Sequence, residues 1–114
     1  MRKTDKKVDN QLRIALTEIC DSALKEFSGF QWLTHLVNYA HFPKSLKVIC
    51  VFDTNDNLKR FMATKSQHGL CTLIQKKLFE MGININSIAG HISYDTQEDC
   101  DKNNNGKWAE RLAK

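Results

Sequence analysis

The chain has 114 residues, of which 41% are hydrophobic and 26% are charged, and its net charge is +4. This length and composition are typical of one globular domain and exclude a disordered or fibrous chain. No apolar run reaches the ~18 residues of a membrane-spanning helix, and the basic start Met1–Lys7 is followed by a charged amphipathic segment, not by the apolar stretch of a secretory signal. We therefore expect a single cytoplasmic domain over residues 1–114, with no membrane partner.

The chain is expected to begin with a helix. Apolar residues recur every three or four positions from Val8 to Phe27, which predicts an amphipathic helix over about residues 5–27. Gly29 follows, and glycine is common at the left-handed position that ends a helix. Residues 1–7 form a short basic N-terminus.

Two strands should come next, close enough in sequence to form a hairpin. Residues 30–42 are rich in aromatic and β-branched types, which predicts a strand that ends at the turn around Pro43. Leu46–Phe52 is apolar at all but one position, so this strand should be covered on both faces and lie at the centre of its sheet.

Two shorter helices and a last strand complete the expected domain. The two helical faces are separated by an interruption at residues 65–69, and Gly82 ends the second of them. Residues 83–94 again have the character of a strand. Residues 95–114 are expected to form an irregular acidic and asparagine-rich tail, with a turn over 102–106.

The expected order is therefore α-β-β-α-α-β plus a C-terminal tail. Within that tail, Thr96–Asp99 could start a short helix, and Trp108, Ala109 and Leu112 could dock a last helical turn. A three-stranded sheet with the helices on one face follows from this order. The fold class is α+β.

No metal site is apparent in the sequence. The cysteines form no C-x-x-C pair, so we expect buried, reduced thiols at Cys20, Cys50, Cys71 and Cys100. Asp101–Gly106 begins like an EF-hand calcium loop, but the twelfth position, which needs a bidentate glutamate, is Leu112. A turn rich in asparagine explains these residues better.

No catalytic site is apparent either. His35 and His41 are too far apart along a regular strand to share a metal, and an acid–base pair would need His91 to lie beside His35 across the sheet. Cys71, close after His68, is the remaining candidate nucleophile. The chain has no glycine-rich phosphate loop, H-E-x-x-H or G-x-S-x-G motif. We expect no enzyme activity, no metal and no cofactor.

The clustered basic residues of the sequence suggest a nucleic-acid partner. They crowd the N-terminus and flank the interruption between the two helical faces, and they could form one positive surface for nucleic acid if the helices pack side by side. The predicted nucleic-acid-binding residues are Arg2, Lys3, Lys6, Lys7, Lys59, Arg60, Lys65, Lys76 and Lys77. A solvated helix face would explain the same residues.

Aromatic residues of the hairpin suggest an alternative. On an open sheet face, Trp32, Tyr39 and Phe42 could stack on bases or bury against a protein partner. In many domains such aromatic residues simply belong to the core. The alternative function is a protein–protein adaptor, or a homodimer that uses this aromatic hairpin.

Four segments resemble a family of small gammaproteobacterial proteins that is often labelled Fis-family transcriptional regulator. These segments are Met1–Lys7, Gly29–Val37, Ser45–Thr54 and Gly106–Trp108. The resemblance extends over nearly the whole chain. It implies a DNA-binding regulator as a third hypothesis.

The predicted topology is similar to the KH-like fold of ribosome-binding factor A. That family interrupts its helical region near a glycine, and Gly69 stands at the matching break. The resemblance implies a KH-like architecture and a partnership with RNA or the ribosome. Our leading hypothesis is therefore a non-enzymatic module that binds RNA or a ribonucleoprotein through its basic helices.

Overall fold

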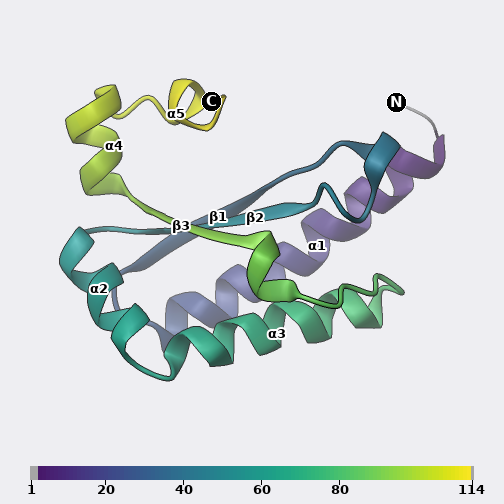
Figure 1. Cartoon of the computed structure of the whole chain (residues 1–114), viewed down its shortest axis with the longest axis horizontal. Coiled ribbons are helices and arrows are strands. Elements are labelled where there is room, and N and C mark those ends of the chain that lie inside the picture. The colour runs from purple at the N-terminus through teal and green to yellow at the C-terminus, as the bar shows by residue number, and fades with distance from the viewer. Residues whose placement is uncertain (1–2, 114) are drawn as a thin grey trace.

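Helices and strands follow one another in the predicted order, α-β-β-α-α-β, in a computed structural model that describes residues 3–113 (Figure 1). Two short helices follow the last strand. The elements are α1 (Lys3–Glu26), β1 (Phe30–Leu36), the 3-10 turn η1 (Tyr39–His41), β2 (Lys47–Phe52), α2 (Asn55–Ala63), α3 (Ser66–Glu80), the 3-10 turn η2 (Ile88–His91), β3 (Ile92–Thr96), α4 (Gln97–Asn104) and α5 (Trp108–Leu112). The protein is α+β, as predicted.

The sheet has the order β1-β2-β3, and β2 is its central strand, as predicted. It pairs antiparallel with β1 and parallel with β3, so the sheet is mixed. One face of β2 carries Val48, Cys50 and Phe52, which belong to the main core with residues of α1 and α3. The side chains of Ile49 and Val51, on the other face, are also buried. Both faces of β2 are therefore covered.

Helix α1 follows the predicted apolar stripe. Its buried side chains include Leu12, Leu16 and Ile19, and the helix lies beside α3 under one face of the sheet (Figure 1). Solvent reaches the opposite side of the helix, which is polar. Within residues 3–113, no helix combines the length and the apolar character needed to cross a membrane.

Both outer strands are shorter than predicted. Strand β1 ends at Leu36 because the Asn38 side chain accepts a hydrogen bond from the Ala40 N–H at 3.0 Å and folds the chain into η1. Strand β3 begins at Ile92, although residues 83–94 alternate like a strand. Ile83, Ile85 and Ile88, which precede β3, are buried in the core but do not pair with a strand. The Ile85 carbonyl instead accepts a hydrogen bond from the Gln75 side-chain amide at 3.1 Å.

The interruption between the two central helices is also shorter than predicted. Helix α2 ends at Ala63, and α3 already begins at Ser66. Gly69, expected at the break, lies inside α3, where an added Cβ would have no heavy atom within 4 Å. Because glycine has a low helix propensity, Gly69 was predicted to lie in the interruption, but α3 continues through it.

Residues 95–114 were predicted to form an irregular tail. Most of the described residues of this segment, 95–113, are helical. Asp95 and Thr96 complete β3, and the Thr96 hydroxyl caps α4 by accepting from the Asp99 N–H at 3.1 Å. Helix α4 continues through Asn104, so the predicted turn over 102–106 shrinks to its last residues. The short helix and the last helical turn expected within the tail both form, as α4 and α5.

Gly29 sets the connection between α1 and the sheet, and it provides a stability test. Its φ is +84°, and a Cβ built there would lie 2.6 Å from the Asn57 Cβ and 2.7 Å from the Asp53 Oδ1. Gly29→Ala should therefore lower the free energy of unfolding by about 2 kcal/mol or more, because strain and overlap add. Gly69→Ala is the control and should raise it by about 0.5–1 kcal/mol, because the site is helical and open. Urea denaturation of both variants measures this, and equal effects would contradict the assignment.

Candidate functional site

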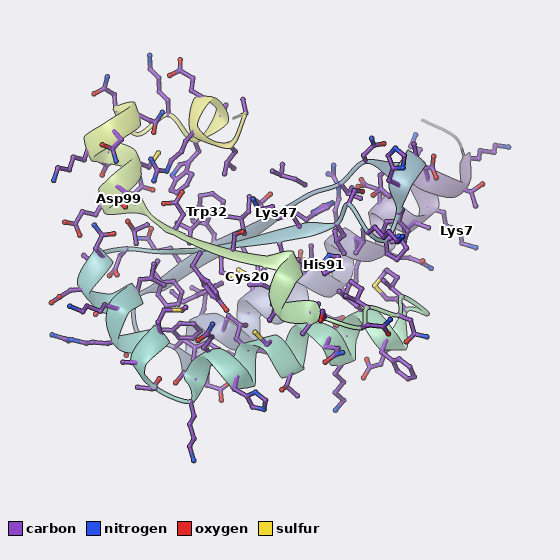
Figure 2. The ribbon with its side chains drawn as sticks, viewed as in Figure 1. Lys7, Cys20, Trp32, Lys47, His91 and Asp99 are labelled. Carbon is purple, nitrogen blue, oxygen red and sulfur yellow. The ribbon has the colours of Figure 1, made fainter. Side chains whose placement is uncertain are left out.

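The structure separates the predicted basic residues along the long axis of the molecule. The first turns of α1, with Lys3, Lys6 and Lys7, lie at one end, where Figure 2 labels Lys7. Helix α2 and the link to α3, with Lys59, Arg60 and Lys65, lie at the other end (Figure 1). Lys76 and Lys77 belong to α3. Arg2 lies outside the described residues.

Some of these cations already have acidic partners. The Lys77 Nζ donates to the Glu18 Oε2 at 2.9 Å, and this hydrogen bond raises the pKa of Lys77. On α2, Arg60 and Asp56 form an exposed ion pair at 3.6 Å. These pairs lower the local positive charge on α2 and α3, so the predicted residues do not contribute equally to a positive surface.

One lysine outside the predicted set joins the end that holds the start of α1. Lys44 follows η1 in the hairpin loop and is exposed, whereas the exposed Lys47, at the start of β2, lies nearer the middle of the molecule (Figure 2). The loop is held beside α1 because the Tyr39 hydroxyl donates to the Asp9 Oδ1 at 2.6 Å. We call the four lysines of this region the basic end: Lys3, Lys6, Lys7 and Lys44.

Asp9 is the centre of a polar cluster beside the basic end. Its Oδ1 accepts from Tyr39 and lies 3.3 Å from the His35 Nε2, and its Oδ2 accepts from the Arg13 Nε at 2.9 Å. The Tyr39 hydrogen bond is the main cause that lowers the pKa of Asp9 below its ordinary value. Burial, together with the same hydrogen bond, raises the pKa of Tyr39. The cluster therefore holds an ionised carboxylate and a neutral phenol.

A groove of about 780 Å³ runs beside this cluster, between α1 and β1. Asp9, His35 and Tyr39 line one part of it. Cys20 also lines the groove, where burial raises the pKa of its thiol and where it forms a hydrogen bond with the Leu33 backbone. A thiol with a raised pKa is a poor nucleophile at neutral pH. Cys20 is therefore not an activated nucleophile in this groove.

The remaining histidines and cysteines are dispersed. The His91 Nδ1 lies 2.7 Å from the Leu46 carbonyl oxygen, and β2 separates β3 from His35 on β1, so His91 and His35 do not form a pair. His68 and Cys71 line a shallow groove of about 300 Å³ on α3, where the Cys71 sulfur is 3.8 Å from the Tyr94 hydroxyl. Over residues 3–113, no three His, Cys, Asp or Glu side chains are grouped as metal ligands.

The aromatic residues of the hairpin all have intramolecular contacts. Trp32 packs edge-on against Trp108 of α5, with ring centroids 4.9 Å apart. Tyr39 is tilted against Phe42 at 5.7 Å, and both rings are partly buried. Each of the three hairpin rings is therefore partly covered within the chain and keeps only part of its surface exposed.

The two last helices close over the sheet face opposite α1 and α3 (Figure 1). Arg111 donates to both carboxylate oxygens of Asp95, at 2.6 and 2.9 Å, and its pKa is raised chiefly by these hydrogen bonds. We call α4 and α5, with the Trp108 and Arg111 contacts, the C-terminal latch. Helix α5 has only five residues and turns these two side chains toward the sheet, so it does not resemble the exposed recognition helix of a DNA-binding helix-turn-helix.

No family model, curated protein or solved structure matches the chain. Two candidate regions follow from the side chains of residues 3–113. One is the basic end, which is a charged surface. The other is the groove between α1 and β1, which has the Asp9 cluster at its side.

The Asp9 cluster gives a pH-dependent stability prediction. Tyr39→Phe should lower the free energy of unfolding at pH 7 by about 1–2 kcal/mol, because it removes a hydrogen bond to a carboxylate. The folded pKa of Asp9 is depressed, so its contribution is present above the unfolded pKa and is lost as pH falls through the folded pKa. The difference between wild type and variant should therefore shrink in acid.

Tyr94→Phe is the matched control for this measurement. The Tyr94 hydroxyl contacts the Cys71 sulfur and no carboxylate in the described contacts, so its effect should be the same at pH 7 and in acid. Chemical denaturation at the two pH values measures both variants. A Tyr39→Phe effect that is independent of pH would contradict the role given to Asp9.

Proposed function

We propose that this chain is a non-enzymatic, cytoplasmic module that binds RNA, alone or in a ribonucleoprotein such as the ribosome, through its basic end. The observation that supports this proposal is that Lys3, Lys6 and Lys7 of α1 and Lys44 of the hairpin loop lie at the same end of the molecule. Cations clustered on one surface are the electrostatic footprint of a nucleic-acid-binding protein.

The local charge balance favours this end over the α2 end. The start of α1, residues 3–7, carries one acid, Asp5, among its three lysines. The Asp9 carboxylate beside the basic end is compensated by Arg13 and by the Tyr39 hydroxyl, so it repels phosphate less than an exposed acid would. By contrast, the α2 end holds the acidic Asp56, Glu98 and Asp99. The Asn55 side chain and backbone bind Asp99 and Glu98, at 2.7 and 2.8 Å, which keeps these acids beside the start of α2.

A KH-like architecture remains part of the proposal, and the order of elements and the mixed sheet are compatible with it. RNA-clamping KH modules hold the RNA backbone with a G-x-x-G loop between two helices. Here the corresponding link is Thr64-Lys65 and offers no such loop. We therefore place the RNA contact at the basic end and not at the link between α2 and α3.

Reduced cysteines support the cytoplasmic part of the proposal. All four cysteines lie within the described residues and are free thiols. Burial raises the pKa of Cys50 to about 12, so this thiol is protonated and inert in the core. Free thiols of this kind are typical of a reducing compartment.

Charge reversal at the two ends tests the proposal. Lys7→Glu with Lys44→Glu should weaken binding to single-stranded RNA and lower the slope of log K against log salt by roughly 0.7 for each phosphate that the variant no longer neutralises. Lys59→Glu with Lys65→Glu changes the same charge at the other end and should have little effect. Fluorescence anisotropy with a labelled RNA, over a range of salt concentrations, measures both.

Two results would contradict this assignment. One is an absence of RNA affinity at low salt, where the electrostatic attraction is strongest. The other is a larger decrease of affinity in the Lys59 and Lys65 variant, which would move the contact to the α2 end. Circular dichroism should show that both variants keep the wild-type helix content, because all four lysines are exposed.

A further inference from the structure

The outer edge of β1 is the less protected edge of the sheet. Among the described strands β1 pairs only with β2, and from Trp32 to Leu36 this pairing is regular after a bulge near Phe30. The strand contains no proline, lysine, arginine or acidic residue. Proteins usually protect an edge strand with such residues or cover it. The other edge, β3, is shorter, and its Asp95 is held by Arg111.

The backbone contacts show which groups of β1 face outward. The Leu33 backbone forms a hydrogen bond with the Cys20 thiol, so its N–H points away from β2. Backbone groups alternate in direction along an antiparallel strand, and His35 therefore points its N–H and C=O outward as well. Another strand added at this edge would form hydrogen bonds with His35 and, by replacing the Cys20 thiol as acceptor, with Leu33.

We propose that a second copy of this chain occupies this edge, so that two chains form a twofold dimer with a continuous six-stranded sheet. The two β1 strands run antiparallel about an axis at Thr34. In this register, Leu33 of each chain exchanges backbone hydrogen bonds with His35 of the other, and the two Thr34 side chains face each other. Leu36, which is 41% exposed, then lies opposite Trp32 of the second copy.

The side chains of α1 explain why the occupant is a second copy and not an unrelated peptide. Arg13, Thr17 and Asp21 line the groove next to β1 and are spaced four residues apart, so they form one stripe. When two such stripes run antiparallel about Thr17, each Arg13 faces an Asp21. The surface is therefore complementary in charge to itself, as a twofold interface requires.

The pairing of the two β1 strands and the contact of the two α1 helices require the twofold axis at the same place. His35 contacts Asp9 and Leu33 contacts Cys20, so Thr34 lies above the part of α1 between these two residues. That part contains Thr17. The same contact would cover an apolar side chain of α1 beside the stripe, Leu24, which is 50% exposed.

A lysine placed at the axis tests the edge pairing. Thr34→Lys would set two like charges against each other, whereas Ser93→Lys adds the same charge to β3. The control is closely matched, because Thr34 and Ser93 flank the same residue, Ile49, from its two sides. Sedimentation equilibrium should give twice the chain mass of 13.1 kDa for wild type and Ser93→Lys. For Thr34→Lys the dissociation constant should rise about tenfold or more.

A charge exchange tests the helix contact and separates it from misfolding. Arg13→Asp and Asp21→Arg should each weaken the dimer about tenfold or more, because each creates two pairs of like charges. The double variant restores opposite charges across the axis and should recover the wild-type dissociation constant. A variant that simply failed to fold would not be rescued by a second substitution.

Three results would overturn the proposal. The first is a wild-type mass of one chain from about 1 µM to about 200 µM, a range that would detect any dimer of moderate affinity. The second is a Thr34→Lys variant that dimerises as well as Ser93→Lys does, which would place the interface elsewhere. The third is a double variant as dissociated as its two parents.

Discussion

Strand β2 must be covered on both of its faces, and most of the other contacts of the protein follow from this requirement. An apolar side chain stabilises the fold only when it is removed from water, and β2 carries such side chains on both sides. Helices α1 and α3 cover one face. The chain must then return to the other face after β3, and the C-terminal latch makes this return. Trp108 meets Trp32 there, and Arg111 binds Asp95.

The elements that could be predicted from the sequence are those with one strong local signal. The run Leu46–Phe52 predicts a strand covered on both faces, and the stripe from Val8 to Phe27 predicts α1; both predictions are confirmed. The predicted start of β3 was wrong because Ile83 and Ile85 have the spacing of a strand face yet, like Ile88, are buried without a strand partner. Burial alone produces that pattern, and hydrogen bonding does not have to accompany it.

The candidate site was harder to predict, because it depends on contacts between distant parts of the chain. The sequence singled out lysines but could not show which of them share one end of the molecule. Lys44 was overlooked because it lies outside any helical pattern. Only the hydrogen bond from Tyr39 to Asp9, which joins the hairpin loop to α1, brings it beside the first helix. The two short helices of the latch were expected from the sequence, but their contacts with Trp32 and Asp95 were not, because these partners are distant in sequence.

The mixed sheet also constrains the order in which the protein can assemble. The antiparallel pair of β1 and β2 joins neighbouring segments, whereas the parallel pair joins Val48 to Ile92 across the whole α2–α3 crossover. Closing that longer loop costs more chain entropy before any contact compensates for it, so non-local pairing of this kind is slow. The Asp95 carboxylate that Arg111 binds is in place only after β3 has joined the sheet. The C-terminal helices α4 and α5 therefore bind a sheet that is already complete. Their contact with Asp95 slows the dissociation of β3, the strand that pairs last.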